Sequence, residues 1–381
     1  MFYNMQIIIN FSFYTAVWHG YASQEWDLTG IALTAVFVAL PLFAFWPIRR
    51  HFFEAFYRLH WVLFIAAIVL AVAHEASAML FGVAFWGVDV LIRAVIIFLN
   101  KNRERSVLCV RLPANVIRLT FLKRDFEYKS GQYAFLCIPE VSWLEWHPFS
   151  ISSSPHENVV SIHIRVLGDW TKRLYDSVEE TRNLNVYVDG PYGAPGIDVD
   201  GSKYKNFMFI SGGIGITPMQ SICNDVLSQH KRGRPLDKMM FIWSVRDLHM
   251  VNSVLEYDRT YYEQNESKQL PLSFSPDLLK RDNTDGVLET YFHLTKERDS
   301  SKFLEANIRP ELQPDLKFGR PDLSKLFTKM KTEVSGKGGN RTRIGVLACG
   351  PTALVNDAEK NCSKFSGNGV TFDFHKEVFE F

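Results

Sequence analysis

The sequence has almost no net charge, few cysteines and none of the usual patterns for calcium or nucleic-acid binding. Its 42 Lys and Arg balance 41 Asp and Glu to a net charge of +1, so no global field favours nucleic acid or acidic substrates. The five Cys have neither zinc-ligand nor disulfide-framework spacing, and reduced cytosolic thiols are the expected state. No Asp-rich EF-hand loop is present, and the amino end lacks the features of a cleaved signal peptide. These absences argue against a nucleic-acid partner, a disulfide-stapled secreted domain and direct calcium control.

Apolar and aromatic residues are abundant, and they are densest in the first hundred positions. Aromatic residues make up 14% of the chain, with 30 Phe. Three apolar runs cover residues 28–47, 59–78 and 80–99. Each is about twenty residues long, which at ~1.5 Å per residue crosses a ~30 Å hydrocarbon core. The sequence therefore predicts a helical transmembrane domain over residues 1–103, in contact with membrane lipid.

Basic residues flank these runs unevenly. They lie at 49–51, between the first two runs, and at 101–105, after the third, whereas the connection near 75–82 has no Lys or Arg. The positive-inside rule places both basic segments in the cytoplasm. The count of three spans also puts everything after residue 100 in the cytoplasm. The span count and the distribution of basic residues therefore agree.

The pattern changes twice after residue 103. Short β-rich runs separated by turn signals, such as 116–122 and 159–167, predict a small antiparallel barrel over residues 104–200. From about residue 205, apolar strands alternate with an amphipathic helix. That alternation predicts a parallel α/β domain over residues 201–381.

A glycine-rich turn, ISGGIGITP at 210–218, follows the first strand of this α/β domain. Gly212, Gly213 and Gly215 allow the backbone to approach a ligand closely. The helix that begins near Pro218 offers free N–H groups and a positive dipole end to a pyrophosphate. The alternative is a plain strand–helix turn, because a lone glycine-rich loop is a weak signal.

The second signal is ACGP at 348–351, which follows the apolar strand 343–347. The carboxyl ends of strands are where α/β sheets bind ligands. A small thiol at Cys349 would let a flat nicotinamide ring come close, while a buried structural cysteine before a turn is the alternative.

The barrel contains a third signal, WHPFSISS at 146–153. Its hydroxyls alternate with apolar residues beside a ring-bearing pair, so this strand could hydrogen-bond a flavin edge and its phosphates. Arg165 follows His163 by two residues, which places both on one face of a strand, and Arg165 could bind a phosphate. An ordinary barrel strand is the alternative.

Two histidines lie in the second apolar run. His60 and His74 are fourteen residues apart, so at ~100° per residue they return to nearly the same helix face, about 21 Å apart along the axis. Ionisable groups within a span are functional candidates by default. Two neutral imidazoles on one face suit the axial ligation of two stacked haems.

Together these residues resemble the ferric reductase and NADPH oxidase superfamily, from about residue 28 onward. The motifs that carry the resemblance are Arg49-Arg50, Phe53-Glu54, His60/His74, WHPFSISS (146–153), HIR (163–165), GDWT (168–171), DGPYG (189–193), GGIGITPM (212–219), WSVRD (243–247), FGRPD (318–322), ACGP (348–351) and FHKEVF (374–379). The resemblance implies an integral membrane protein, at the plasma membrane, whose barrel and α/β domain form a ferredoxin-reductase-type unit.

The resemblance also implies roles for single residues. The flavin-binding set would be His147, Pro148, Phe149, Ser150, Ser153, His163, Arg165 and Thr171. The NADPH-binding set would be Gly212, Gly213, Gly215, Thr217, Pro218, Arg246, Gly350 and Pro351. Arg246 would pair with the 2′-phosphate and so favour NADPH over NADH. Cys349 would lie near the hydride-transfer site, with Phe379 as the aromatic cover of the flavin ring; Glu380 and Phe381 follow here, so Phe381 is a second candidate for the cover.

The chain departs from the family at its front. The family has about six spans, and a preceding helix supplies a second His ligand for each haem. Here His60 and His74 are haem iron ligands without their partners, because upstream only His19 and His51 remain and neither lies in a span. We expect an incomplete gene prediction, with a genuinely truncated form as the alternative. The flavin and nucleotide motifs are complete.

The resulting expectation is an oxidoreductase that passes electrons from cytosolic NADPH through FAD, and through haem b if the partner helix is present, to dioxygen, giving superoxide. A ferric chelate is the alternative acceptor. An anchored NADPH diaphorase without haem, and a non-enzymatic subunit that pairs with a full-length relative, are the competing hypotheses. The sequence does not identify regulatory subunits.

Overall fold

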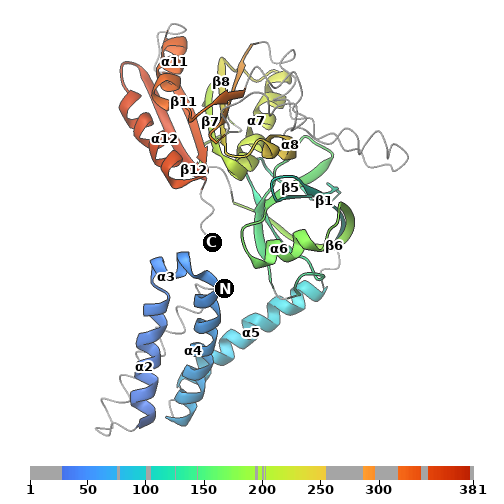
Figure 1. Ribbon diagram of the computed structural model, residues 1–381, viewed down its shortest axis with the longest axis vertical. Coiled ribbons are helices and arrows are strands. Elements are labelled where there is room, and N and C mark those ends of the chain that lie inside the picture. Colours follow the sequence, from blue (N-terminus) through green and yellow to red (C-terminus); the bar gives the residue numbers. More distant parts are fainter. Residues whose placement is uncertain are drawn as a thin grey trace. The chain divides into compact units, whose positions relative to one another are not determined.

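The computed structural model describes residues 28–74, 78–99, 104–124, 126–143, 145–193, 196–199, 201, 203–254, 286–296, 316–335 and 342–377. The chain divides into two compact units, residues 1–101 and 102–381. Figure 1 shows that the first is helical and that the second combines sheets and helices.

The helices of the first unit are α2 (Leu28–Phe43), α3 (Trp46–His51), α4 (Phe53–Ala73) and α5 (Ala78–Leu99). Helices α2 and α4 pack along an apolar seam that contains Leu33 and Phe37 from α2 and Ala67 and Ala71 from α4. The small alanines let the two helices approach closely. Elsewhere many apolar side chains are exposed, which is the pattern of a surface that contacts lipid or another apolar partner.

The helix bounds differ from the three predicted runs. Helix α2 ends at Phe43 rather than at 47, because Pro41 lies in its last turn and Pro47 in the first turn of α3. Helix α4 begins six residues before the second predicted run. Among the described residues one segment, Ala55–Ala73, is long and apolar enough to cross a membrane, and the apolar segments Leu28–Phe43 and Leu80–Ile92 are shorter. This candidate segment overlaps the second of the three predicted runs.

The flavin-side domain of the second unit is an antiparallel sheet with the strand order β4-β3-β6-β1-β2-β5. Its strands are β1 (Glu104–Leu112), β2 (Val116–Leu122), β3 (Tyr133–Cys137), β4 (His147–Ser150), β5 (Val159–Arg165) and β6 (Thr181–Tyr192), with helix α6 (Asp169–Asp176) after β5. The edges meet because Ser152, just after β4, donates its N–H to the Ser161 carbonyl of β5 at 2.8 Å. The sheet thus curls around an apolar interior, as predicted for a small barrel.

The nucleotide-side domain is a parallel sheet with the order β10-β9-β8-β7-β11-β12. Its elements are β7 (Asn206–Gly212), the 3₁₀ turn η2 (Gly213–Gly215), α7 (Ile216–Lys231), β8 (Lys238–Val245), α8 (His249–Val254), β9 (Leu288–Leu294), β10 (Leu316–Phe318), α11 (Leu323–Ser335), β11 (Thr342–Cys349), α12 (Thr352–Phe365) and β12 (Val370–Glu377). Helices α7 and α8 cover one face and α11 and α12 the other (Figure 1). This is the doubly wound α/β arrangement.

Helix α7 is buried on two opposite sides. Its apolar side packs on the sheet, and its polar side faces the barrel. There Ser221 donates its hydroxyl to the Ser153 carbonyl at 2.6 Å, and its own carbonyl accepts the Ser154 hydroxyl at 2.7 Å. Ser130 of the barrel also donates to Asp225 at 2.9 Å. The helix that carries the glycine-rich turn is therefore hydrogen-bonded directly to the flavin-side domain.

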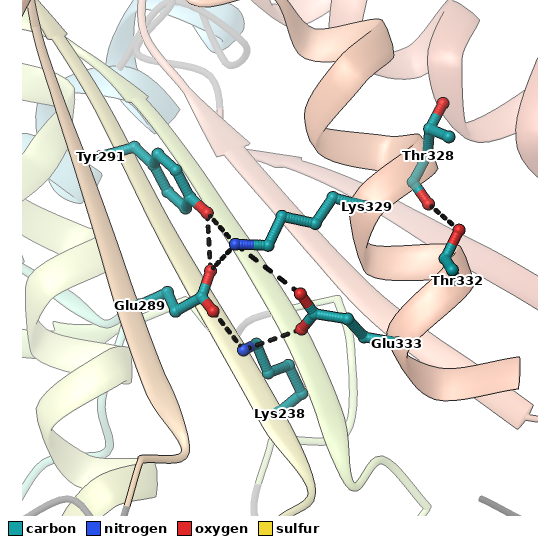
Figure 2. Close-up of polar contacts among 7 residues, drawn as sticks. All are labelled: Lys238, Glu289, Tyr291, Thr328, Lys329, Thr332 and Glu333. Atoms are coloured by element: carbon teal, nitrogen blue, oxygen red, sulfur yellow. Dashed lines mark hydrogen bonds and ion pairs between the residues drawn. The ribbon is translucent and has the colours of Figure 1, made fainter. Parts of the chain in front are cut away.

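A network of ion pairs fixes α11 to the sheet (Figure 2). Lys238 bonds Glu289 at 2.5 Å and Glu333 at 2.8 Å, and Lys329 bonds Glu289 at 2.7 Å. The Tyr291 hydroxyl donates to Glu289 at 2.6 Å. Burial alone would raise the pKa of Glu289, but hydrogen bonds from Lys238, Lys329 and Tyr291 outweigh it and lower that pKa to about 2. Glu289 is therefore ionised at neutral pH.

Candidate functional site

The two predicted nucleotide motifs meet at the centre of the parallel sheet. Strand β7 leads into the glycine-rich turn, strand β11 leads into ACGP, and these strands are neighbours with Cys349 opposite Ser211. The order β9-β8-β7-β11-β12 changes direction between β7 and β11. Such a switch point is where open α/β sheets bind ligands, beyond the carboxyl ends of the strands.

Glycines let the two loops touch backbone to backbone. A Cβ on Gly350 would lie 2.8 Å from the Gly212 nitrogen and 2.9 Å from its Cα, and Gly350 has a φ of +142°. A Cβ on Gly215 would lie 2.7 Å from the Cys349 carbonyl oxygen. A side chain at either position would push the loops apart. The two motifs therefore form one continuous surface.

The start of α7 is held in place beside this surface. Trp243 of β8 donates its indole N–H to the Gly213 carbonyl at 2.9 Å, and the Thr217 hydroxyl donates to the Ile214 carbonyl at 3.1 Å. Pro218 lies in the first turn, where a missing N–H costs nothing. The remaining N–H groups and the positive end of this 16-residue helix suit a phosphate.

Two arginines approach the same edge of the sheet. Arg246 is exposed just beyond the carboxyl end of β8, the strand next to β7. Arg165, at the end of barrel strand β5, places its Nη1 3.6 Å from the position of a Cβ on Gly213. The phosphate-binding candidate of the flavin side therefore lies against the glycine-rich turn of the nucleotide side.

Three aromatic rings gather on the flavin side. The His147 and Trp170 ring centroids are 4.5 Å apart, and Phe149 stacks on Trp170 with centroids at 5.8 Å. Within the described part of the chain, His147 Nε2 and Trp170 Nε1 are buried without a hydrogen-bond partner. Burial is also the main factor that lowers the pKa of His147. Ring faces with unused ring nitrogens beside them fit a flat heteroaromatic cofactor such as flavin.

Trp170 was not among the predicted site residues. It lies in the first turn of α6, and the signal that could have found it is the motif GDWT at 168–171, which contains it. Thr171 accepts the N–H groups of Leu167 at 3.0 Å and Gly168 at 3.1 Å. Its hydroxyl thus fixes the turn that holds Trp170 against His147.

The serines after β4 form hydrogen bonds that hold the barrel together. The Ser153 hydroxyl accepts the Ser161 N–H at 2.9 Å and bonds the Tyr128 hydroxyl at 2.9 Å, and the Ser152 hydroxyl accepts the His163 N–H at 3.1 Å. Ser153 is fully buried. These contacts join the chain after β4 to strand β5, so the hydroxyl of Ser153 closes the barrel. Ser150 is also buried, whereas Pro148 is half-buried.

His163 and Arg165 have different environments on the same strand. Burial, and then the charge of Arg118, lower the pKa of His163 to about 3, so its imidazole is neutral at physiological pH. Arg165 is half-buried. Of the two, Arg165 is the residue with a positive charge to offer a phosphate.

Cys349 is fully buried at the junction of the two loops. Burial, and then the charge of Glu377, raise the pKa of its thiol. A neutral thiol is a poor nucleophile, so Cys349 is suited to forming a small wall beside a ring rather than to covalent chemistry. Strand β12 ends at Glu377, opposite Cys349, and Phe379 lies outside the described residues.

The histidines of the first unit lie at two levels of α4. His60 is buried, with its Nδ1 unpartnered within the described region, and it belongs to a buried stripe with Phe56, Phe64, Ala67 and Ala71. His74 caps the carboxyl end of the helix. A buried imidazole in an apolar helix fits an axial haem ligand.

The fold and site define a two-domain, flavin-dependent reductase. Residues 102–196 match the FAD-binding domain family, and residues 204–363 match the ferric reductase NAD binding domain family. The two matches adjoin at the linker between the barrel and the parallel sheet, and they account for the two halves of the site.

Among curated proteins, the chain is similar to a superoxide-generating NADPH oxidase heavy chain of Dictyostelium discoideum, with 28% identity over 92% of this chain and 53% of that protein. It is 30% identical to dual oxidase 2 of Rattus norvegicus over 88% of this chain and 22% of that protein. It is 29% identical to NADPH oxidase 1 of Mus musculus over 73% of this chain and 46% of that protein. The chain thus spans about half the length of two of these relatives and about a fifth of the third.

The chain belongs to the ferric reductase and NADPH oxidase superfamily. It is an oxidoreductase, and its two matched domains are an FAD-binding domain and a ferric reductase NAD binding domain.

Proposed function

We propose that the protein takes electrons from cytosolic NADPH through FAD and haem to dioxygen and produces superoxide. The relatives that support an oxygen acceptor are named as superoxide-generating or NADPH oxidases. A ferric chelate, the acceptor of the other branch of the superfamily, is the second candidate. When bound, FAD supplies the conversion of a two-electron donor into single electrons.

One observation carries the proposal: Arg165 of the barrel lies beside Gly213 of the nucleotide turn. Because these two residues belong to the two different cofactor sites, the sites adjoin, which hydride transfer requires. In this arrangement Gly212, Gly213 and Gly215, with the first turn of α7, hold the pyrophosphate. Arg246 binds the 2′-phosphate by guanidinium pairing, and Cys349 borders the nicotinamide.

The flavin ring packs against His147, Phe149 and Trp170, with Arg165 at its phosphates. In the proposed route to the membrane, His60 and His74 are the residues that would hold haem, which would supply single-electron transfer when bound. The apolar helix Ala55–Ala73 supports an integral membrane location, and the basic flanks of the apolar runs favour a cytoplasmic position for residues after 100. We place the protein at the plasma membrane.

The decisive experiment uses the full chain in detergent or membranes, supplied with FAD and haem. NADPH should drive cytochrome c reduction that superoxide dismutase abolishes, and NADH should be a poor donor. Arg246→Ala should raise the KM for NADPH at least tenfold while leaving the KM for NADH nearly unchanged, because the pair with the 2′-phosphate contributes about 1.5–3 kcal/mol.

Three other outcomes would support a different function. Reduction of ferric chelate under anaerobic conditions, without superoxide in air, favours the ferric reductase alternative. Dye reduction in membranes without a b-type difference spectrum favours an anchored diaphorase. No NADPH-dependent dye reduction in a folded, FAD-supplied protein refutes the enzymatic proposal and leaves the non-enzymatic alternative.

A further inference from the structure

A linker joins the barrel to the parallel sheet and lies along strand β12. It comprises the described residues within 193–205, between β6 and β7, and several of its apolar side chains belong to the core on the α7 side of the sheet. Phe372 of β12 packs into the core on the opposite face. Because side chains alternate along a strand, Asp373, His375 and Glu377 lie on the face that carries the linker.

The imidazole of His375 fixes the beginning of this linker. Gly196 donates its N–H to His375 Nε2 at 3.1 Å. The ring lies so close to the Gly196 backbone that a Cβ on Gly196 would overlap it. Farther along the linker, the Tyr204 hydroxyl donates to Asp373 at 2.9 Å. The linker is therefore attached to β12 at two residues, and a glycine allows the close contact with the first.

The same ring nitrogen has a second contact. His375 Nε2 lies 2.9 Å from Oε1 of Glu377, the next residue on this face of β12. An imidazole nitrogen carries either one proton or one lone pair in the plane of the ring. A bare Nε2 accepts the Gly196 N–H and makes no bond to the carboxylate, whereas a protonated Nε2 donates to Glu377 and has no lone pair for Gly196. The two contacts are therefore alternatives, and the proton decides between them.

Glu377 lies beside the proposed nicotinamide site. It is opposite Cys349 in the parallel pairing of β11 with β12. Burial, and then the charge of Glu377, raise the pKa of the Cys349 thiol, so the field of this carboxylate reaches the position where the ring is proposed to lie. A carboxylate there stabilises the positive charge that develops on a nicotinamide ring as hydride leaves it. An imidazolium paired with Glu377 would cancel much of this stabilisation.

We infer that His375 is a positioning residue for hydride donation: when neutral it holds Gly196 and leaves the charge of Glu377 uncompensated by the ring, and when protonated it pairs with Glu377 and releases the linker. The inference rests on the proposed position of the nicotinamide beside Cys349. Hydride donation therefore slows as the ring becomes protonated. One proton sets both the linker contact and the charge beside the reaction.

Other ionisable groups lie on the elements packed around this pair. Those that the structure describes on β12, β11, the linker and α7 are Asp373, Arg343, Asp198, Lys203, Asp225 and His230. Among these residue types only histidine ordinarily changes charge between about pH 5 and 8. His230 lies in the last turn of α7, far along the helix from the glycine-rich turn, and its Nδ1 bonds the Arg234 carbonyl at 2.7 Å. His230 is therefore the matched control for His375.

The test measures the reduction of bound flavin by NADPH in the full chain, in detergent and loaded with FAD. Anaerobic stopped-flow traces are recorded from about pH 5 to pH 8. The main variant is His375→Gln, because glutamine offers an acceptor to Gly196 and a donor to Glu377 without a change of charge. His230→Gln is the control. The FAD content and the Kd for NADPH are measured for each protein.

In the wild type, the rate constant at saturating NADPH should fall about threefold to tenfold as the pH falls through the histidine range, with little change in Kd. His375→Gln should lose this step, and His230→Gln should keep it. Gly196→Ala should keep the step but move it to higher pH. Its Cβ displaces the ring from the linker and so removes the contact that competes with the proton for Nε2.

A wild-type rate without a step in this range, or a FAD-loaded His375→Gln protein that keeps the step, overturns the inference and leaves the proposed function intact. Loss of the step in His230→Gln also overturns it. An unmoved step in Gly196→Ala overturns the competition at Nε2, and this variant decides the question if His375→Gln does not bind FAD. Flavin that NADPH does not reduce at any pH in the wild type refutes the proposed function itself.

Discussion

Replacing Gly350 by alanine should push apart the two loops that form the nucleotide site. A Cβ at this position would lie 2.8 Å from the Gly212 nitrogen, 2.9 Å from its Cα and 3.1 Å from its carbonyl oxygen. All three are backbone atoms at the end of the central strand β7, so no side chain can rotate to relieve the contact. The end of β7 and the turn after β11 must move apart, which widens the surface that holds the pyrophosphate.

The cost has two separable parts. A side chain at a φ of +142° costs about 1–3 kcal/mol in backbone strain, and the collision with Gly212 costs about 1–3 kcal/mol more. Gly367→Ala is the matched control, because Gly367 has a φ of +130° and nothing lies within 4 Å of the position that its Cβ would take. The control therefore reports the backbone strain alone.

The assay is urea unfolding of the full chain in detergent, together with the KM for NADPH in dye reduction. Gly350→Ala should lose about 2–6 kcal/mol of unfolding free energy and Gly367→Ala about 1–3 kcal/mol. If about 1.4 kcal/mol of the distortion falls on nucleotide binding, the KM for NADPH rises about tenfold in Gly350→Ala, and it is unchanged in Gly367→Ala. Equal stability losses and equal KM values in the two variants would refute the interlocked-loop geometry.

Three further predictions concern the ion-pair network of Figure 2, the thiol and the domain contact. Glu289→Gln should destabilise the protein by about 1–3 kcal/mol at pH 7. Because the folded pKa of Glu289, about 2, is below its ordinary 4.5, this stabilisation is present above pH 4.5 and is lost as the pH falls toward 2; a difference in urea midpoints that stays constant from pH 7 to pH 3 would contradict this. Cys349 should resist iodoacetamide in the native protein at neutral pH and react after unfolding, since its thiol is buried and neutral; rapid native labelling seen by mass spectrometry would show an accessible thiolate. Ser221→Ala should cost about 1 kcal/mol and weaken the coupling between the domains, whereas Ser363→Ala, whose hydroxyl bonds its own helix at Glu359, should be neutral in the same unfolding assay.

The contact of α7 with the barrel has a consequence for the proposed reaction. The helix that would receive the nucleotide phosphates through its first turn also bonds Ser153 and Ser154 through Ser221. These serines directly follow the strand that carries His147 and Phe149. Helix α7 is therefore joined by direct hydrogen bonds to the segment that follows the flavin-side strand β4.

The sequence by itself determined the class of fold and the residue types of the site. Apolar runs, β-rich runs and strand–helix alternation are local patterns, and they predicted a helical part, an antiparallel barrel and a parallel α/β domain. Glycine spacing at 212–215 pointed to close backbone approach, because only glycine tolerates it. The motif at 348–351 pointed to a small residue beside a flat ring. The family resemblance added the cofactors, of which the matches to two domain families confirmed FAD and a nicotinamide nucleotide.

The tertiary structure alone decided which of these residues meet. Gly212 and Gly350 are separated by more than a third of the chain, and only the pairing of β7 with β11 places one against the other. The same holds for Arg165 beside Gly213, and for Trp170 against both His147 and Phe149. Burial also separated roles that looked alike in the sequence: His163 is neutral while Arg165 remains charged, and the Ser153 hydroxyl closes the barrel. Contacts and desolvation depend on distant neighbours, and a local sequence pattern carries no information about them.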